Sequence, residues 1–146
     1  MRMLLDTNVV SELRKPDHRI DPCVANWAES EDPADHWLSA ITVMELAIGI
    51  SRKERRDPDQ GRRLRAWFSA SVLDAFKGRI LPVDLAAALA AADLHASDPR
   101  PERDALIAAT AQVHRLTVAT RNTRDFDTLG VQTFNPWLHE RRTAES

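Results

Sequence analysis

The 146-residue chain contains one cysteine, Cys23, and four glycines that stand apart at Gly49, Gly61, Gly78 and Gly130. A single cysteine forms no internal disulfide and supplies no structural zinc site, and we expect Cys23 to be a buried small apolar residue. The scattered glycines form neither a P-loop nor a dinucleotide-binding fingerprint. Because internal disulfides are excluded, a reducing compartment is favoured, and we expect a cytoplasmic protein.

The five histidines include no pair at metal-ligand spacing, and no serine stands in a nucleophile-elbow context. These absences disfavour serine and cysteine hydrolases. The longest apolar run, residues 85–92, lies between Asp84 and Asp93 and is far shorter than the roughly 20 residues that span a bilayer. Asp6 interrupts the apolar run at the N-terminus, so we expect neither a secretory signal nor a membrane association.

Charge is distributed unevenly along the chain, although the net charge is only −2. Residues 52–65 carry seven basic side chains against three acidic ones. Such an excess suits a position beside nucleic-acid phosphates, and it equally suits a solvated helix and loop. The composition leaves both interpretations of this segment open.

Short strand-like runs alternate with segments whose apolar residues recur at helical spacing. Strands are predicted at 2–6, 36–40, 80–83, 116–120 and 131–134. Helices are predicted at 7–14, 22–30, 43–56, 60–77, 84–97 and 102–115, followed by a short turn at 124–129. This alternation is typical of a single-domain, three-layer α/β/α fold with a mostly parallel central sheet.

Four acidic residues follow strands or begin helices in this arrangement. Asp6 ends the first strand, Glu45 is expected in the first turn of the helix at 43–56, and Asp104 lies in the first turn of the helix at 102–115. Asp125 follows the fourth strand. Ligands of parallel sheets gather at the carboxyl ends of the strands, so we expect these carboxylates to converge on one edge of the sheet.

Each of these carboxylates also has a local structural explanation. Asp6 is a favourable cap for the first helix, and Glu45 completes a capping box with Thr42. Asp104 is favoured by the helix dipole, and Asp125 is a possible cap for the turn that follows it. Capping, however, does not require the four side chains to face one crevice, whereas a shared binding site does.

Carboxylates that crowd together repel each other, and some must take up protons unless a cation balances them. Magnesium suits such a site, because it binds a few carboxylates together with water and phosphate oxygens. Two-metal sites clamp the attacking and leaving oxygens of an in-line displacement. We therefore hypothesise a site that cleaves phosphodiester bonds and holds one or two Mg²⁺ ions.

Five segments carry a family resemblance: LLDTNVVSEL, ITVMELAIGI, DALIAATAQVHRLTVATRN, RDF and FNPW. Together and in this order they resemble the PIN-domain family, and within it the VapC- and FitB-type toxins of bacterial toxin–antitoxin pairs. The likeness extends from about residue 3 to residue 137. It implies a PIN-like nuclease domain at 1–137, followed by a polar C-terminal tail at 138–146.

The resemblance implies an endoribonuclease that hydrolyses RNA phosphodiester bonds with water activated by Mg²⁺, or by Mn²⁺ as a substitute. The family's four catalytic and metal-binding acids map onto Asp6, Glu45, Asp104 and Asp125. Asn8, Thr120 and Asn122 resemble groups that orient a carboxylate or a metal-bound water, although local turn chemistry explains them equally well. Asp127 is a weaker candidate that is expected to face solvent.

The resemblance also implies partners. A VapB/FitA-like antitoxin is expected to silence the enzyme, the protein is expected to form a homodimer, and DNA is expected to be bound only indirectly, through the antitoxin. Apolar residues that either form an interface or pack in the core are Trp27, Trp67, Phe68 and Phe76. Substrate preference is expected to reside in the basic segment at 52–65.

Two other functions remain as alternatives. The first is a PIN-fold module that binds RNA or protein without cleaving it, which the intact acidic residues disfavour. The second is a phosphoacceptor receiver domain, which also places an aspartate at a strand end. That chemistry needs an adjacent acidic pair and a lysine on a later strand, and here the late strand is followed by Arg121 instead.

Overall fold

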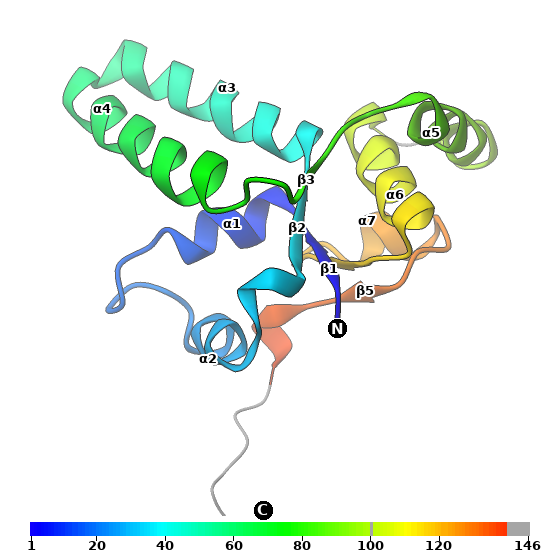
Figure 1. Cartoon of the computed structure of the whole chain (residues 1–146), viewed down its shortest axis with the longest axis horizontal. Coiled ribbons are helices and arrows are strands. Elements are labelled where there is room, and N and C mark those ends of the chain that lie inside the picture. The colour runs from blue at the N-terminus through cyan, green and yellow to red at the C-terminus, as the bar shows by residue number, and fades with distance from the viewer. Residues whose placement is uncertain (100, 140–146) are drawn as a thin grey trace, which may run out of the picture.

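Five parallel strands form the central sheet of the molecule (Figure 1). The computed structural model describes residues 1–99 and 101–139. The strands are β1 (Met3–Leu5), β2 (His36–Ser39), β3 (Ile80–Leu81), β4 (Thr117–Ala119) and β5 (Thr133–Phe134). They lie in the order β3-β2-β1-β4-β5, and every neighbouring pair is parallel. The predicted α/β fold with a parallel sheet is confirmed.

Helices cover both faces of this sheet. They are α1 (Thr7–Leu13), α2 (Pro22–Ser30), α3 (Ala40–Arg56), α4 (Pro58–Trp67), α5 (Leu85–Ser97), α6 (Glu102–His114) and α7 (Arg124–Asp127). Short 3₁₀ turns lie at η1 (Pro33–Asp35) and η3 (Pro136–Leu138), and a π-helical segment, η2 (Phe68–Asp74), follows α4. In Figure 1, α1 to α4 lie on one side of the sheet and α5 to α7 on the other.

Alternating side chains of β1 build two cores, one on each face of the sheet. Met3 and Leu5 pack with residues of α1 to α4, such as Trp27. Leu4 packs on the opposite face with residues of α6 and α7, such as Ile107. Because all three residues of β1 are buried, the strand lies in the middle layer of a three-layer structure.

Helix α3 begins at Ala40, earlier than the predicted start at residue 43. Ser39 caps the helix, because its side chain accepts a hydrogen bond from the Ile41 amide at 3.0 Å. Thr42 lies inside the helix and is fully buried. The predicted capping box of Thr42 and Glu45 is therefore wrong, and Glu45 lies in the second helical turn rather than the first.

The basic segment at 52–65 forms the hairpin between α3 and α4. A Cβ atom on Gly61 would lie 2.6 Å from the Cα atom of Glu54, so this glycine allows α4 to approach α3 closely. Arg65 pairs with Glu54 at 2.7 Å, and Arg62 pairs with Asp59. Two of the basic side chains thus have acidic partners within the hairpin.

Trp27 and Phe68 are buried in the core, which is one of the two alternatives that the sequence left open, whereas Trp67 and Phe76 are only partly buried and pack against the core.

Two other predictions need correction. Cys23, near the start of α2, is partly exposed rather than buried. The helix predicted at 60–77 changes to π-helical geometry at Phe68, and within the described ranges no helix is long and apolar enough to cross a membrane. Residues 140–146 of the predicted tail lie outside the described residues.

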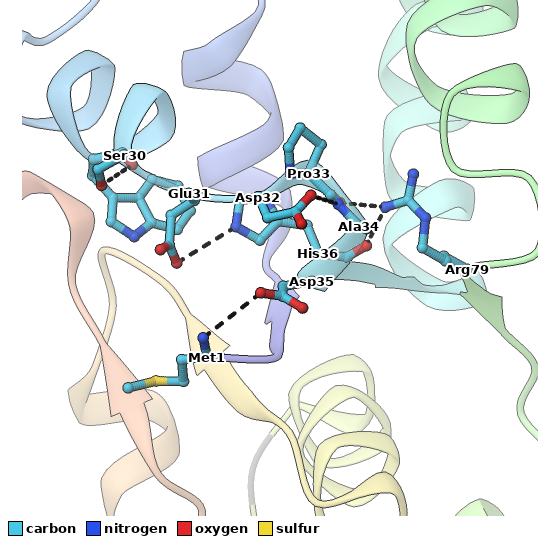
Figure 2. Close-up of polar contacts among 10 residues, drawn as sticks. Met1, Ser30, Glu31, Asp32, Pro33, Ala34, Asp35, His36 and Arg79 are labelled. Carbon is cyan, nitrogen blue, oxygen red and sulfur yellow. Dashed lines mark hydrogen bonds and ion pairs between the residues drawn. The ribbon is translucent and has the colours of Figure 1, made fainter.

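His36 is buried at the start of β2, at the edge of the sheet opposite the carboxyl ends of the strands. Figure 2 shows it beside Glu31, Asp35 and Arg79. Its ring stacks on Trp27 with a centroid distance of 5.1 Å, and its Nε2 atom lies 3.7 Å from a Glu31 oxygen. Burial lowers the pKa of His36 below its ordinary value of 6.5, and the Glu31 carboxylate opposes this shift.

The lowered pKa of His36 predicts a loss of stability in acid. Below about pH 6.5 the unfolded chain binds a proton on this side chain more readily than the folded protein, so stability is complete above that pH and falls as the pH falls. We expect the melting temperature to drop less steeply between about pH 7.5 and pH 5.5 in a His36→Phe variant, which keeps an aromatic ring against Trp27. Plots of melting temperature against pH that run parallel for the parent and the variant would contradict this expectation.

Candidate functional site

Asp6 occupies the first position after β1 and caps helix α1. Only 8% of its surface is exposed. Its carboxylate accepts hydrogen bonds from the Thr7 amide at 2.8 Å, the Thr120 hydroxyl at 2.8 Å and the Asn8 side-chain amide at 3.3 Å. The capping explanation and the site explanation for Asp6 are therefore compatible, because one oxygen caps the helix and the other receives side-chain donors.

The segment after β4 is tied to the segment after β1 by side chains that the sequence singled out. Thr120 is fully buried, donates to Asp6, and accepts a hydrogen bond from the Asn122 amide at 3.0 Å. The side-chain oxygen of Asn8 accepts a hydrogen bond from the Arg121 amide at 3.2 Å. Asn8 and Thr120 thus contact the carboxylate directly, whereas Asn122 bonds Thr120 through its backbone amide.

The electrostatic environment of Asp6 disfavours its charge. Burial raises the pKa of Asp6 above 3.8, and the charge of Asp125 raises it further. Hydrogen bonds from Thr120, Thr7 and Asn8 act in the opposite direction, because they stabilise the ionised form. The net result is a raised pKa, which a bound cation would lower.

Glu45 is connected to the same site by Thr7, a residue that the sequence analysis did not single out. The Thr7 hydroxyl donates to one Glu45 oxygen at 2.8 Å, while the Thr7 amide donates to Asp6. Arg103, at the start of α6, lies 3.8 Å from the other Glu45 oxygen. The position of Thr7 between Asp6 and Asn8 in the DTN motif was the available signal for its role.

The remaining acidic candidates lie on the helices that follow β3 and β4. Asp104 is half-buried in the first turn of α6, next in sequence to Arg103. Asp125 lies inside α7, whose cap position is Thr123, so its predicted capping role is wrong. Asp127 is exposed and accepts a hydrogen bond from Thr133 at 2.9 Å, which joins α7 to β5.

These carboxylates do not by themselves form a chelating cluster. Within residues 1–99 and 101–139, no three histidine, cysteine or acidic side chains are placed so that they could hold a metal ion together. Asp6 interacts electrostatically with Asp125, and Thr7 joins Asp6 to Glu45. Two carboxylates are nevertheless a sufficient protein contribution for magnesium, which keeps several waters and takes further oxygens from substrate phosphates.

The chain belongs to the PIN domain family, whose model matches residues 3–131. It is 39% identical to the VapC ribonuclease Y4jK of Sinorhizobium fredii, over 92% of this chain and 97% of the relative. It is 41% identical to Toxin FitB of Neisseria gonorrhoeae, over 92% of this chain and 98% of that protein. A solved structure of FitAB bound to the IR36 DNA fragment superposes with a TM-score of 0.84 and 36% identity, over 97% of this chain and 99% of the other.

The raised pKa of Asp6 predicts how an Asp6→Asn substitution changes stability with pH. Because the folded-state pKa of Asp6 lies above 3.8, this side chain contributes to folding stability at low pH. That contribution is lost as the pH rises through the folded-state pKa. In a buffer with a chelator, the parent should therefore become less stable relative to Asp6→Asn as the pH rises from about 4 to about 7. Melting temperatures of the two proteins test this. A difference that stays constant across the pH range would show that the charge of Asp6 does not destabilise the folded protein.

Proposed function

We propose that the protein is a metal-dependent endoribonuclease and the toxin of a toxin–antitoxin pair. The observation that carries this proposal is the buried carboxylate of Asp6, held by three donors beside Asp125 with a raised pKa. A folded protein keeps a charge in such a place at a cost, and a divalent cation offsets that cost. The names of the relatives, a VapC ribonuclease and a toxin, support the same assignment.

We assign the metal to Asp6 and Asp125, with Glu45 and Asp104 contributing directly or through water. The chemistry of these donors fits, because oxygen ligands suit Mg²⁺ and Mn²⁺ and the excess negative charge needs a counter-ion. Once bound, the ion lowers the pKa of a coordinated water and stabilises charge on the phosphate.

The chain's own residues orient the groups that act on the RNA. Thr7 and Thr120 hold the Asp6 and Glu45 carboxylates in place, so neither side chain has to reorganise when substrate binds. Thr7 bonds one Glu45 oxygen and Arg103 lies 3.8 Å from the other, so both contacts orient the carboxylate, which we propose accepts a proton from water. Arg103 also provides a positive charge for a phosphate at the mouth of the site.

A PIN-fold module that binds RNA without cleaving it is the alternative. The two functions differ in one measurable respect. The enzyme cleaves RNA and stops when the metal is removed, whereas the module cleaves no RNA with or without metal.

We expect the purified protein to cut RNA in Mg²⁺ and to stop when a chelator is added. Asp6→Asn nearly keeps the shape of the side chain but removes its charge, so we expect it to lower the cleavage rate by more than about 100-fold. Asp127→Asn is the matched control, because Asp127 is exposed and bonded to Thr133, and it should cut at the parent rate. Cleavage by Asp6→Asn at the parent rate, or cleavage that persists in chelator, would refute the enzyme.

We propose a VapB/FitA-like antitoxin as the protein partner. An acidic pocket that binds cations also accepts an arginine or lysine side chain, which would pair with the carboxylates in place of metal. The solved FitAB structure contains DNA, and we propose that this chain reaches DNA only through its antitoxin. We propose that the domain at 1–137 carries these functions in the cytoplasm.

We propose that helix α5 forms the interface of a homodimer. Leu85 and Leu89 project from it with 75% and 60% of their surfaces exposed. Beside them a groove of about 210 Å³ is lined by Ala88 and Ala92 of α5 and by Leu106 of α6. Leu85 lies three residues before Ala88 and Leu89 three residues before Ala92, so the leucines share one face of α5 with these lining residues. Such a face suits a second copy of the chain, since a two-fold interface must be complementary to itself.

A double substitution Leu85→Glu with Leu89→Glu should therefore convert a dimer into a monomer. Burying charged side chains between two copies without partners is strongly unfavourable. Leu138→Glu is the control, because Leu138 is 76% exposed in η3 rather than on α5, and this variant should remain dimeric. Light scattering after size-exclusion chromatography measures the outcome, and a monomeric parent or a dimeric double variant would exclude the α5 interface.

A further inference from the structure

Gly49 lies in the interior of α3, where glycine destabilises a helix relative to alanine. A Cβ atom built on Gly49 would meet no atom within 4 Å. Gly61 is different, because a Cβ atom there would collide with Glu54. Packing within the chain therefore explains the glycine at position 61 but not the one at position 49.

The open space above Gly49 is part of a groove of about 210 Å³. Its lining includes Thr7 and Glu45, the residues that join this groove to the acidic site, together with Ser11 and Arg14 from the α1 side. Trp67, at the end of α4, forms part of the opposite side and is only partly buried. The groove is thus continuous with the candidate active site, and its lining combines an aromatic ring, a hydroxyl and a positive charge with the aliphatic side chains of Leu46, Ile50 and Leu64.

We propose that this groove binds a nucleotide of single-stranded RNA next to the scissile phosphodiester, and that Gly49 keeps it open. The proposal rests on the ribonuclease function argued above. Single-stranded RNA is recognised by stacking of bases on aromatic side chains and by cationic contacts to phosphates. Trp67 supplies the stacking surface, Arg14 contacts a phosphate, and the Ser11 hydroxyl lies within the same groove for a polar contact to the nucleotide.

RNA suits the groove better than a protein segment because of what the two ends of the groove provide. Thr7 and Glu45 belong to the site where the phosphodiester is cut, so the substrate must leave that site along an adjoining surface. Arg14 adds a positive charge to a groove that starts at a carboxylate, which complements the charge of the next phosphate. The groove would then help to set the base preference on one side of the cut.

Substitutions that fill the groove test the proposal. Gly49→Leu places a leucine side chain in the open space, Gly49→Ala adds a single methyl group, and Ala66→Leu places the same leucine side chain at an exposed site on α4 that does not line the groove. The probe is a random-sequence mixture of short, fluorescein-labelled single-stranded RNAs. Its Kd is measured by fluorescence anisotropy in Mg²⁺, with Asp6→Asn in every protein to prevent cleavage, and kcat and KM are measured for the same substitutions without Asp6→Asn.

We expect Gly49→Leu to raise the Kd and KM about tenfold or more, Gly49→Ala to have a smaller effect, and Ala66→Leu to match the parent. The melting temperature should stay constant or rise in the Gly49 variants, because both replacements favour the helix. Weaker RNA binding in a protein that melts no earlier than the parent is a result that misfolding does not produce.

If Gly49→Leu binds and cuts RNA like the parent, the groove proposal is wrong and the ribonuclease function stands. If the parent cuts no RNA, the ribonuclease function is wrong, and the binding measurements alone decide whether the groove holds RNA. A Gly49→Leu variant that loses only its affinity for the co-expressed antitoxin would also overturn the proposal, because the occupant would then be a protein segment.

Discussion

The site depends on one buried charge, the carboxylate of Asp6 at the end of β1. A carboxylate in that position requires donors, and it receives them from the first turn of α1 and from the end of β4. The neighbouring strands β1 and β4 are parallel, so the segments that follow them leave the sheet at the same edge. At that edge the Thr120 hydroxyl donates a hydrogen bond to Asp6. The hydrogen bonds that satisfy the charge therefore also join the segments that surround the site.

Thr7 extends this constraint to the helix that follows β2. Its amide is bonded to Asp6 and its hydroxyl to Glu45, so a shift of α3 would disturb both carboxylates. The position of α3 is in turn restrained by α4, whose close approach requires Gly61 and which is paired with α3 through Arg65 and Glu54. Packing away from the acids thus restrains the helix that carries Glu45.

Features that depend on a short stretch of chain were predictable from the sequence, and features that depend on packing were not. Asp6 follows a buried strand, and this position alone indicated the edge of the sheet at which it lies. The start of α3 was mispredicted because Ser39 and Thr42 are both favourable caps, and only the burial of Thr42 in the folded protein decides between them. The contact of Thr7 with Glu45 joins positions 38 residues apart, and the groove above Gly49 exists only once three helices have packed.

Two features in and beside the candidate site reduce the folding stability of the protein, and they have different physical origins. The charge of Asp6 is disfavoured by burial and by Asp125, and the glycine at position 49 costs about 0.5–1 kcal/mol relative to alanine. Either feature alone is ordinary in a protein that is stable by only about 5–15 kcal/mol. They occur, however, on elements joined by Thr7, one at the acids and one in the groove that begins there. A ligand that supplies positive charge at the acids and fills the groove would offset both, and such uncompensated local costs are expected where a protein is shaped by what it binds.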